Sequence, residues 1–135
     1  EEAALYLLDR FAFDSVLLPV NMFCWRDGDF ARRVCETAPQ KGTGVLALKS
    51  LAKRRLKEGE KRKWPKCWYV PMETLEEARA ALSFTLSRPV TAAVCPGHAE
   101  LLWLACDAVA SLSETEVSPS AANSIDGDPI FRTAS

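Results

Sequence analysis

The chain has a single histidine, no closely spaced pair of cysteines and no long hydrophobic run. One histidine, His98, and five cysteines without a CxxC spacing argue against a zinc cluster, so we predict no metal site. No apolar stretch approaches the roughly 18 residues that a membrane helix needs, which argues against a spanning segment. An odd number of cysteines in apolar surroundings favours reduced thiols, and we therefore expect a cytoplasmic protein.

The composition is that of an ordinary globular protein. Apolar residues make up 48% of the chain and charged residues 26%, which excludes a disordered, collagen-like or disulfide-scaffold class over most of its length. A length of 135 residues suits one domain or a piece of a larger one. The chain begins with Glu1 and not with methionine, and an acidic start is not a secretory signal. We expect that a natural N-terminal portion is missing.

Basic residues are concentrated in one segment. The net charge is −1, yet residues 49–66 contain nine of the 17 lysines and arginines and only two acidic residues, Glu58 and Glu60. This segment therefore carries +7, and the remainder of the chain carries −8. Such a basic loop in an acidic body indicates either an anion-binding site or a solvated loop.

Hydrophobic patterning predicts helices and strands in alternation. Unbroken apolar runs such as "SVLLPV" favour strands that are buried on both faces, as in a parallel sheet. Thr74 and Glu77 have the spacing of a capping box, which marks the start of a helix. The helices are expected at residues 1–11, 29–38, from 74 to about 86, and 98–110, with strands at 15–20, 44–49 and 90–95.

This order predicts an α/β fold in which the three strands are parallel and adjacent. A doubly wound sheet and a (β/α)8 barrel both contain the pattern, and a whole barrel needs about 250 residues, so the chain would be roughly half of one. Residues 1–112 are assigned to this partial barrel domain. Residues 113–135 are expected to form a mostly irregular tail, with Ser113 and Glu116 as a capping pair and a surface segment ending in "DPIFRTAS".

Three segments together resemble the C-terminal half of the aldo-keto reductases. "FDSVLLPVNMFCW", residues 13–25, is similar to the sixth barrel strand, although the Asn-Gln pair of the family is Asn21-Met22 here. "KGTGVLALKSLAKR", residues 41–54, is similar to the seventh strand and its loop. "FTLSRPVTAAVCPGHAELL", residues 84–102, is similar to the eighth strand with its flanking helix and Pro-Gly turn. The tail also resembles a bacterial branch of predicted aldo/keto reductases.

The resemblance implies a TIM barrel of which this chain holds strands six to eight, and an NAD(P)H-dependent reduction of a small carbonyl substrate. The cofactor is expected to be NADP or NAD. The catalytic Asp, Tyr, Lys and His of the family lie on the first four strands, which precede Glu1, so no catalytic residue is assigned in this chain. We expect a fragment, the cofactor-side half, that is inactive alone.

The cofactor-binding residues are expected at the carboxyl ends of the strands. Lys49, Ser50 and Leu51 form the turn after the second strand, and Pro96 and Gly97 form the turn that opens the last helix. A glycine and a helix N-terminus allow backbone N–H groups to approach a phosphate, and Lys49 adds a positive charge. Asn21 is predicted either to bind the nicotinamide carboxamide or to cap backbone groups.

An alternative function belongs to a different class. The basic loop 49–66, with Trp64, Trp68 and Tyr69 as stacking groups, suits a nucleic-acid- or anion-binding module. The acidic body argues against nucleic acid, since such modules usually spread basic charge over a whole face. His98, at a helix start and without a visible partner, is interpreted as a cap or phosphate contact and not as an acid or base.

Overall fold

Three parallel strands form the central sheet of the chain, which a computed structural model describes for residues 1–133. Strands β1 (Ser15–Pro19), β2 (Gly44–Leu48) and β5 (Ala92–Ala93) are adjacent in the order β1-β2-β5, and both pairings are parallel. The predicted α/β class, strand order and direction are therefore confirmed. The described residues form an open sheet and no closed barrel.

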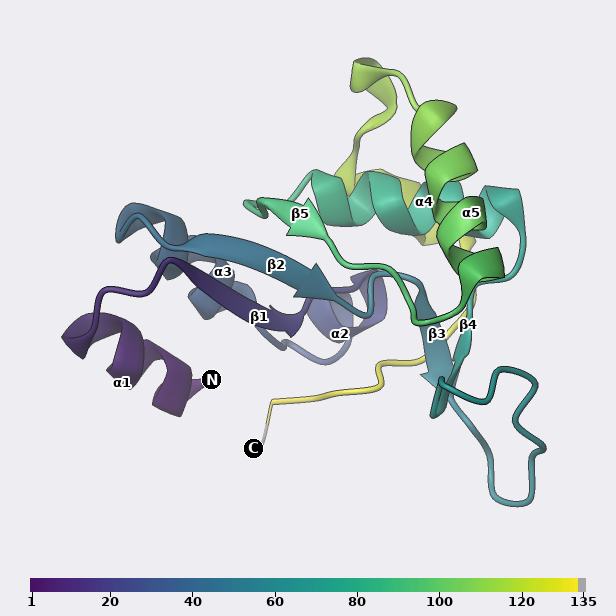
Figure 1. Ribbon diagram of the computed structural model, residues 1–135, viewed down its shortest axis with the longest axis horizontal. Helices are drawn as coiled ribbons and strands as arrows, with labels where there is room; N and C mark the ends of the chain where they lie inside the picture. The colour runs from purple at the N-terminus through teal and green to yellow at the C-terminus, as the bar shows by residue number, and fades with distance from the viewer. Residues whose placement is uncertain (134–135) are drawn as a thin grey trace.

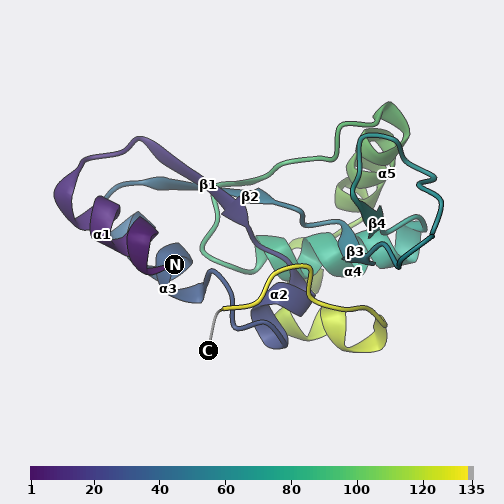
Figure 2. The ribbon, with the colours of Figure 1, turned by 90° about the horizontal axis from the view of Figure 1, so that it is seen from below.

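Only one face of this sheet is covered. Figure 2 shows α2 (Met22–Arg26), α3 (Arg32–Gln40) and α4 (Leu75–Leu86) on the same side of the strands. Val45 and Ala47 point toward these helices and are fully buried, whereas Leu17 on the other face is 55% exposed. The expectation of strands buried on both faces is wrong for this chain, because side chains alternate along a strand and only one set finds a helix.

The four expected helices are present, and a fifth was not foreseen. α1 (Glu2–Arg10), α4 and α5 (Ala99–Ala110) lie where the patterns placed them, and the Thr74–Glu77 capping box is formed. α3 begins later than predicted because Asp29 and Ala31 have φ angles of 46° and 73°, which are not helical. The short α2 was missed. Within the described part of the chain, no helix is long and apolar enough to cross a membrane.

Part of the predicted basic loop is a β-hairpin. Strands β3 (Ala52–Arg55) and β4 (Tyr69–Pro71) pair antiparallel, with a bulge between Ala52 and Arg54. Figure 1 shows the hairpin at the carboxyl end of the parallel sheet, with its long connecting loop extending away from the body. The sequence assigned this segment to a loop because its many charges hide the strand pattern.

The C-terminal tail contains two short 3-10 helices, η1 (Glu114–Glu116) and η2 (Pro119–Ser124), and then packs back onto the body. The backbone N–H of Asp128 donates to the Lys53 carbonyl (3.0 Å), and that of Thr133 donates to the Gly28 carbonyl (2.9 Å). Ile130 is completely buried. The expected surface segment is therefore wrong for Pro129 and Ile130, which are buried, whereas Asp128, Arg132 and Thr133 are exposed as expected. Ala134 and Ser135 lie outside the described residues.

Burial of Ile130 makes the tail a stabilising part of the fold. We expect Ile130→Ala to lower the free energy of unfolding by about 2 to 5 kcal/mol, the range for truncating a buried aliphatic side chain. The matched control is Leu17→Ala, whose side chain is 55% exposed and whose loss should cost much less. Urea denaturation of both variants measures the difference, and equal effects would contradict a docked tail.

Candidate anion-binding site

Two turns predicted to bind a cofactor lie at the same edge of the sheet. Lys49 and Ser50 follow β2, and Pro96 and Gly97 follow β5, its parallel neighbour. The pairing continues past β5, because the backbone N–H of Val94 donates to the Ala47 carbonyl (2.8 Å). The carboxyl ends of parallel strands meet at one edge, and the sequence-based prediction that these turns share an edge is confirmed (Figure 1).

The backbone of Lys49 is held in a left-handed conformation. Its φ angle is 64°, a region that non-glycine residues seldom occupy and that costs free energy. The amide nitrogen of Asn21 donates to the carbonyl oxygens of Lys49 (3.2 Å) and Ala52 (2.5 Å), which bracket the turn. The Ala52 N–H also donates to the Lys49 carbonyl (2.9 Å). The strained turn is thus closed by one buried side chain.

Asn21 has the capping role that the sequence left open beside a nicotinamide contact. It is 1% exposed, and its Oδ1 accepts a hydrogen bond from the backbone N–H of Cys24 (2.9 Å) at the start of α2. Both hydrogens of its amide are engaged by the Lys49 turn. Asn21 therefore supports the site from beneath and has no donor left for a ligand.

In the turn formed by Lys49, Ser50 and Leu51, the charged side chain that reaches solvent is that of Lys49. Its Nζ lies 4.7 Å from the ring centroid of Tyr69 and 5.6 Å from that of Trp68, on the hairpin. Among the side chains that the structure describes, no carboxylate lies within 4.0 Å of this ammonium group. Ser50 and Leu51 are 2% and 1% exposed, so they offer at most backbone groups to a ligand.

The second turn opens α5 and is flanked by a lysine that sequence reasoning did not single out. The first backbone bond of α5 runs from Leu102 N–H to the His98 carbonyl (3.0 Å), and no side chain caps this end. The Lys66 side chain passes over Gly97, where a Cβ would lie 3.5 Å from its Cδ. The charge excess of residues 49–66 indicated either an anion site or a solvated loop, and it gave Lys66 no particular role.

His98 binds the hairpin loop and has no catalytic geometry. Its Nε2 accepts a hydrogen bond from the backbone N–H of Lys66 (3.0 Å), and its ring packs edge-on against Trp64 with centroids 5.1 Å apart. These contacts connect the hairpin loop to the start of α5. The interpretation of the His98 side chain as a helix cap is wrong, because it makes no capping hydrogen bond to α5 and accepts one from Lys66 instead.

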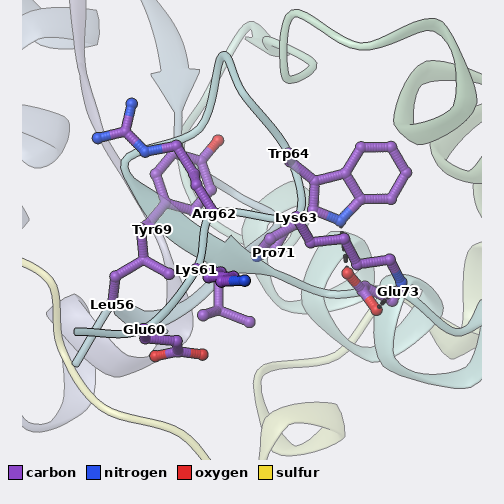
Figure 3. Close-up of a pocket in the computed structure, with 10 residues that line it drawn as sticks. Leu56, Glu60, Lys61, Arg62, Lys63, Trp64, Tyr69, Pro71 and Glu73 are labelled. Atoms are coloured by element: carbon purple, nitrogen blue, oxygen red, sulfur yellow. Dashed lines mark hydrogen bonds and ion pairs between the residues drawn. The ribbon is translucent and has the colours of Figure 1, made fainter. Parts of the chain in front are cut away.

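A pocket of about 190 Å³ lies between the β3–β4 hairpin and its connecting loop, and Figure 3 shows the residues that line it. Its wall is apolar and aromatic, and its rim is charged. Glu73 accepts hydrogen bonds from Lys63 Nζ (2.7 Å) and from the indole N–H of Trp64, which fixes both side chains. The residues of the pocket that the figure draws include Leu56, Trp64, Tyr69 and Pro71 from the wall and Glu60, Lys61, Arg62, Lys63 and Glu73 from the rim.

Three of the nine cations of residues 49–66 are paired with carboxylates. Ion pairs join Lys53 to Glu77 (2.5 Å) and Arg54 to Glu60 (2.8 Å), and Lys63 is bound by Glu73. Burial alone would raise the pKa of Glu77, but hydrogen bonds from Lys53 and from backbone N–H groups outweigh burial and lower it. The available cations are therefore fewer than the sequence indicates.

Searches of family models, curated proteins and solved structures return no match to this chain. Among the side chains that the structure describes, no group of three or more His, Cys, Asp or Glu residues is arranged to hold a metal ion. All five cysteine thiols are free, and those of Cys24, Cys35 and Cys67 are buried. The arguments for a function therefore come from the turns, the hairpin and their charges.

The Arg54–Glu60 pair makes the hairpin sensitive to acid. The hydrogen bonds from Arg54 and from the Lys57 backbone lower the pKa of Glu60 from 4.5 to about 2. A depressed pKa contributes stability that is present above pH 4.5 and is lost as the pH falls toward 2. We expect the Glu60 carboxyl carbon to titrate near pH 2 by NMR.

Arg54→Met should return the pKa of Glu60 toward 4.5. The control is Arg62→Met, because Arg62 has no carboxylate partner among the described side chains, and this change should leave the pKa of Glu60 near 2. A wild-type midpoint close to 4.5 would show that the ion pair does not form in solution.

Proposed function

We propose that this chain is the cofactor-side portion of an NAD(P)H-dependent oxidoreductase that resembles the aldo-keto reductases and reduces a small carbonyl substrate. In this proposal β1, β2 and β5 correspond to strands six to eight of a (β/α)8 barrel. Their parallel pairing in sequence order supports the correspondence. The catalytic groups would belong to the preceding strands, so the chain alone would bind cofactor without turning over substrate.

The observation that carries the proposal is the conformation of Lys49. A lysine with a φ of 64° at the end of a parallel strand is strained, and such strain persists where surrounding contacts enforce it, often at functional sites. Here the buried Asn21 amide enforces it. The result is an ammonium group without a carboxylate partner among the described side chains, at the edge where α/β proteins bind phosphates.

The remaining residues have supporting roles in this proposal. Gly97 gives the cofactor pyrophosphate access to the backbone N–H groups at the start of α5, with Pro96 shaping the turn. Lys66, which passes over Gly97, supplies a second positive charge. Ser50 and Leu51 contribute backbone only, because both side chains are buried. No residue of this site selects NADP over NAD or the reverse.

The uncovered sheet surfaces support a larger parent structure. β1 and β5 are both edge strands, and no helix of the described residues covers the face that carries Leu17. Parallel sheets occur almost only with both faces covered. Further barrel strands would pair with these edges and enclose the open face. The free thiols agree with a cytoplasmic location, which is part of the proposal.

Lys49→Ala should weaken cofactor binding by about 1 to 3 kcal/mol, the range for a hydrogen bond to a charged group. The measurement is a titration of the 135-residue chain with NADPH and with NADH, followed by nucleotide fluorescence. Gly97→Val should also weaken binding, because its branched side chain fills the space that the phosphate needs.

The matched control is Lys41→Ala, which removes a lysine that is paired with Asp9 (3.0 Å) at the opposite end of the sheet. Its affinity should equal that of the wild type. Unchanged affinity for both nucleotides in Lys49→Ala and Gly97→Val would remove these residues from the site, and absence of binding by the wild type would refute the proposal for this chain.

The hairpin pocket favours a second candidate function, the binding of single-stranded nucleic acid. Trp64 lines this pocket with an aromatic ring, and Lys61 and Arg62 lie on the same rim, whereas Tyr69, the other predicted stacking group of the pocket, is only 3% exposed. Phosphate contacts would make affinity fall steeply with salt. The test is a titration with a fluorescent single-stranded oligonucleotide at rising salt. Arg62→Ala should reduce the salt dependence of the affinity. Absence of binding at low salt would exclude the function.

A further inference from the structure

A second basic site lies away from the sheet edge, around Trp25 of α2. Arg88, just after α4, places its guanidinium carbon 5.4 Å from the Trp25 ring centroid and 5.0 Å from that of Phe84. Its Nε and Nη2 donate to the Ser87 hydroxyl (3.3 and 3.0 Å). Among the side chains that the structure describes, no carboxylate lies within ion-pair distance of Arg88.

A second arginine borders the same indole. Arg32, the first residue of α3, places its guanidinium carbon 5.6 Å from the Trp25 ring centroid. Its Nε and Nη2 donate to the Trp25 carbonyl (3.0 and 2.7 Å), which holds the group in place. Its one carboxylate neighbour, Asp29, is 3.4 Å from Nε and largely exposed. Three separate elements thus bring two cations to one aromatic side chain.

Asp29 offsets part of the charge of Arg32, but no carboxylate of the described side chains offsets that of Arg88. Partial burial lowers the pKa of Arg88, and the nearby charge of Arg32 lowers it further. Neither arginine has a hydrogen-bond acceptor within the described residues for its Nη1 group. Like charges that are partly removed from water destabilise a fold unless an anion offsets them.

We propose that Arg32 and Arg88 form a binding site for a phosphate group, with Trp25 and Phe84 as its aromatic support. A phosphate dianion carries enough charge to neutralise two guanidinium groups, and its oxygens suit the planar donors of arginine. Cation–π contact with the aromatic rings and the hydrogen bonds to Trp25 and Ser87 hold the guanidinium groups in place, which lowers the entropy lost on binding. The site is separate from the Lys49 turn and does not depend on the proposed cofactor function.

The experiment follows the Nε–Hε resonances of the arginines by NMR while inorganic phosphate is added to the 135-residue chain at constant ionic strength. We expect saturable shifts at Arg88 and Arg32, with at least a tenfold loss of affinity in Arg88→Gln. The matched control is Arg79→Gln, which removes an arginine of α4 that is already paired with Glu116 (2.8 Å) and should leave the affinity unchanged.

A second titration with phenyl phosphate distinguishes the source of the group: tighter binding than inorganic phosphate indicates the phosphate ester of a larger molecule, and equal binding indicates the free ion. Either result supports the site. Shifts that rise linearly without saturation, or that persist in Arg88→Gln, overturn it. Should Arg88→Gln fail to fold, Arg32→Gln serves as the second variant, and unchanged affinity in that variant is equally contrary to the proposal.

Discussion

The buried amide of Asn21 is the constraint on which the arrangement of the candidate site depends. One side chain caps α2 through its oxygen and closes the turn from Lys49 to Ala52 through its nitrogen. It therefore joins the end of β1 to the end of β2 and to the start of β3. Every polar atom of the amide has a partner inside the protein, so these hydrogen bonds compensate the desolvation penalty of burying it. The strained Lys49 backbone is a consequence of this connection.

The hairpin and the tail pack together at the same end of the sheet. Arg55 on β3 donates two hydrogen bonds to the Ile130 carbonyl (2.8 and 2.5 Å), and Phe131 stacks on Phe30 with ring centroids 5.4 Å apart. Gly127 passes so close to the Phe23 ring that a Cβ has no room there. Residues more than 70 positions apart thereby support one end of the sheet. The positively charged loop consequently projects from a fixed base.

The positive charge that this protein offers to a ligand depends more on which cations are paired with carboxylates than on the total number of cations. The acidic body supplies Glu73 and Glu77 to the basic segment, where they pair with Lys63 and Lys53. Lys49, Arg62 and Arg88 are cations without a carboxylate partner among the described side chains. An external anion gains more at such a cation than at one whose charge a carboxylate already offsets.

Local patterns in the sequence determined the α/β class, the three parallel strands, the helix boundaries near Thr74 and His98, and the position of the Lys49 and Gly97 turns. Each depends on propensity, capping or hydrophobic period over a few neighbouring residues. Only the tertiary structure decided that Leu17 faces solvent, that Ile130 is buried, that residues 52–71 form a hairpin and that Arg32 meets Arg88 at Trp25. These features arise from contacts between residues far apart in the chain, and no local pattern records which distant partner a side chain will meet.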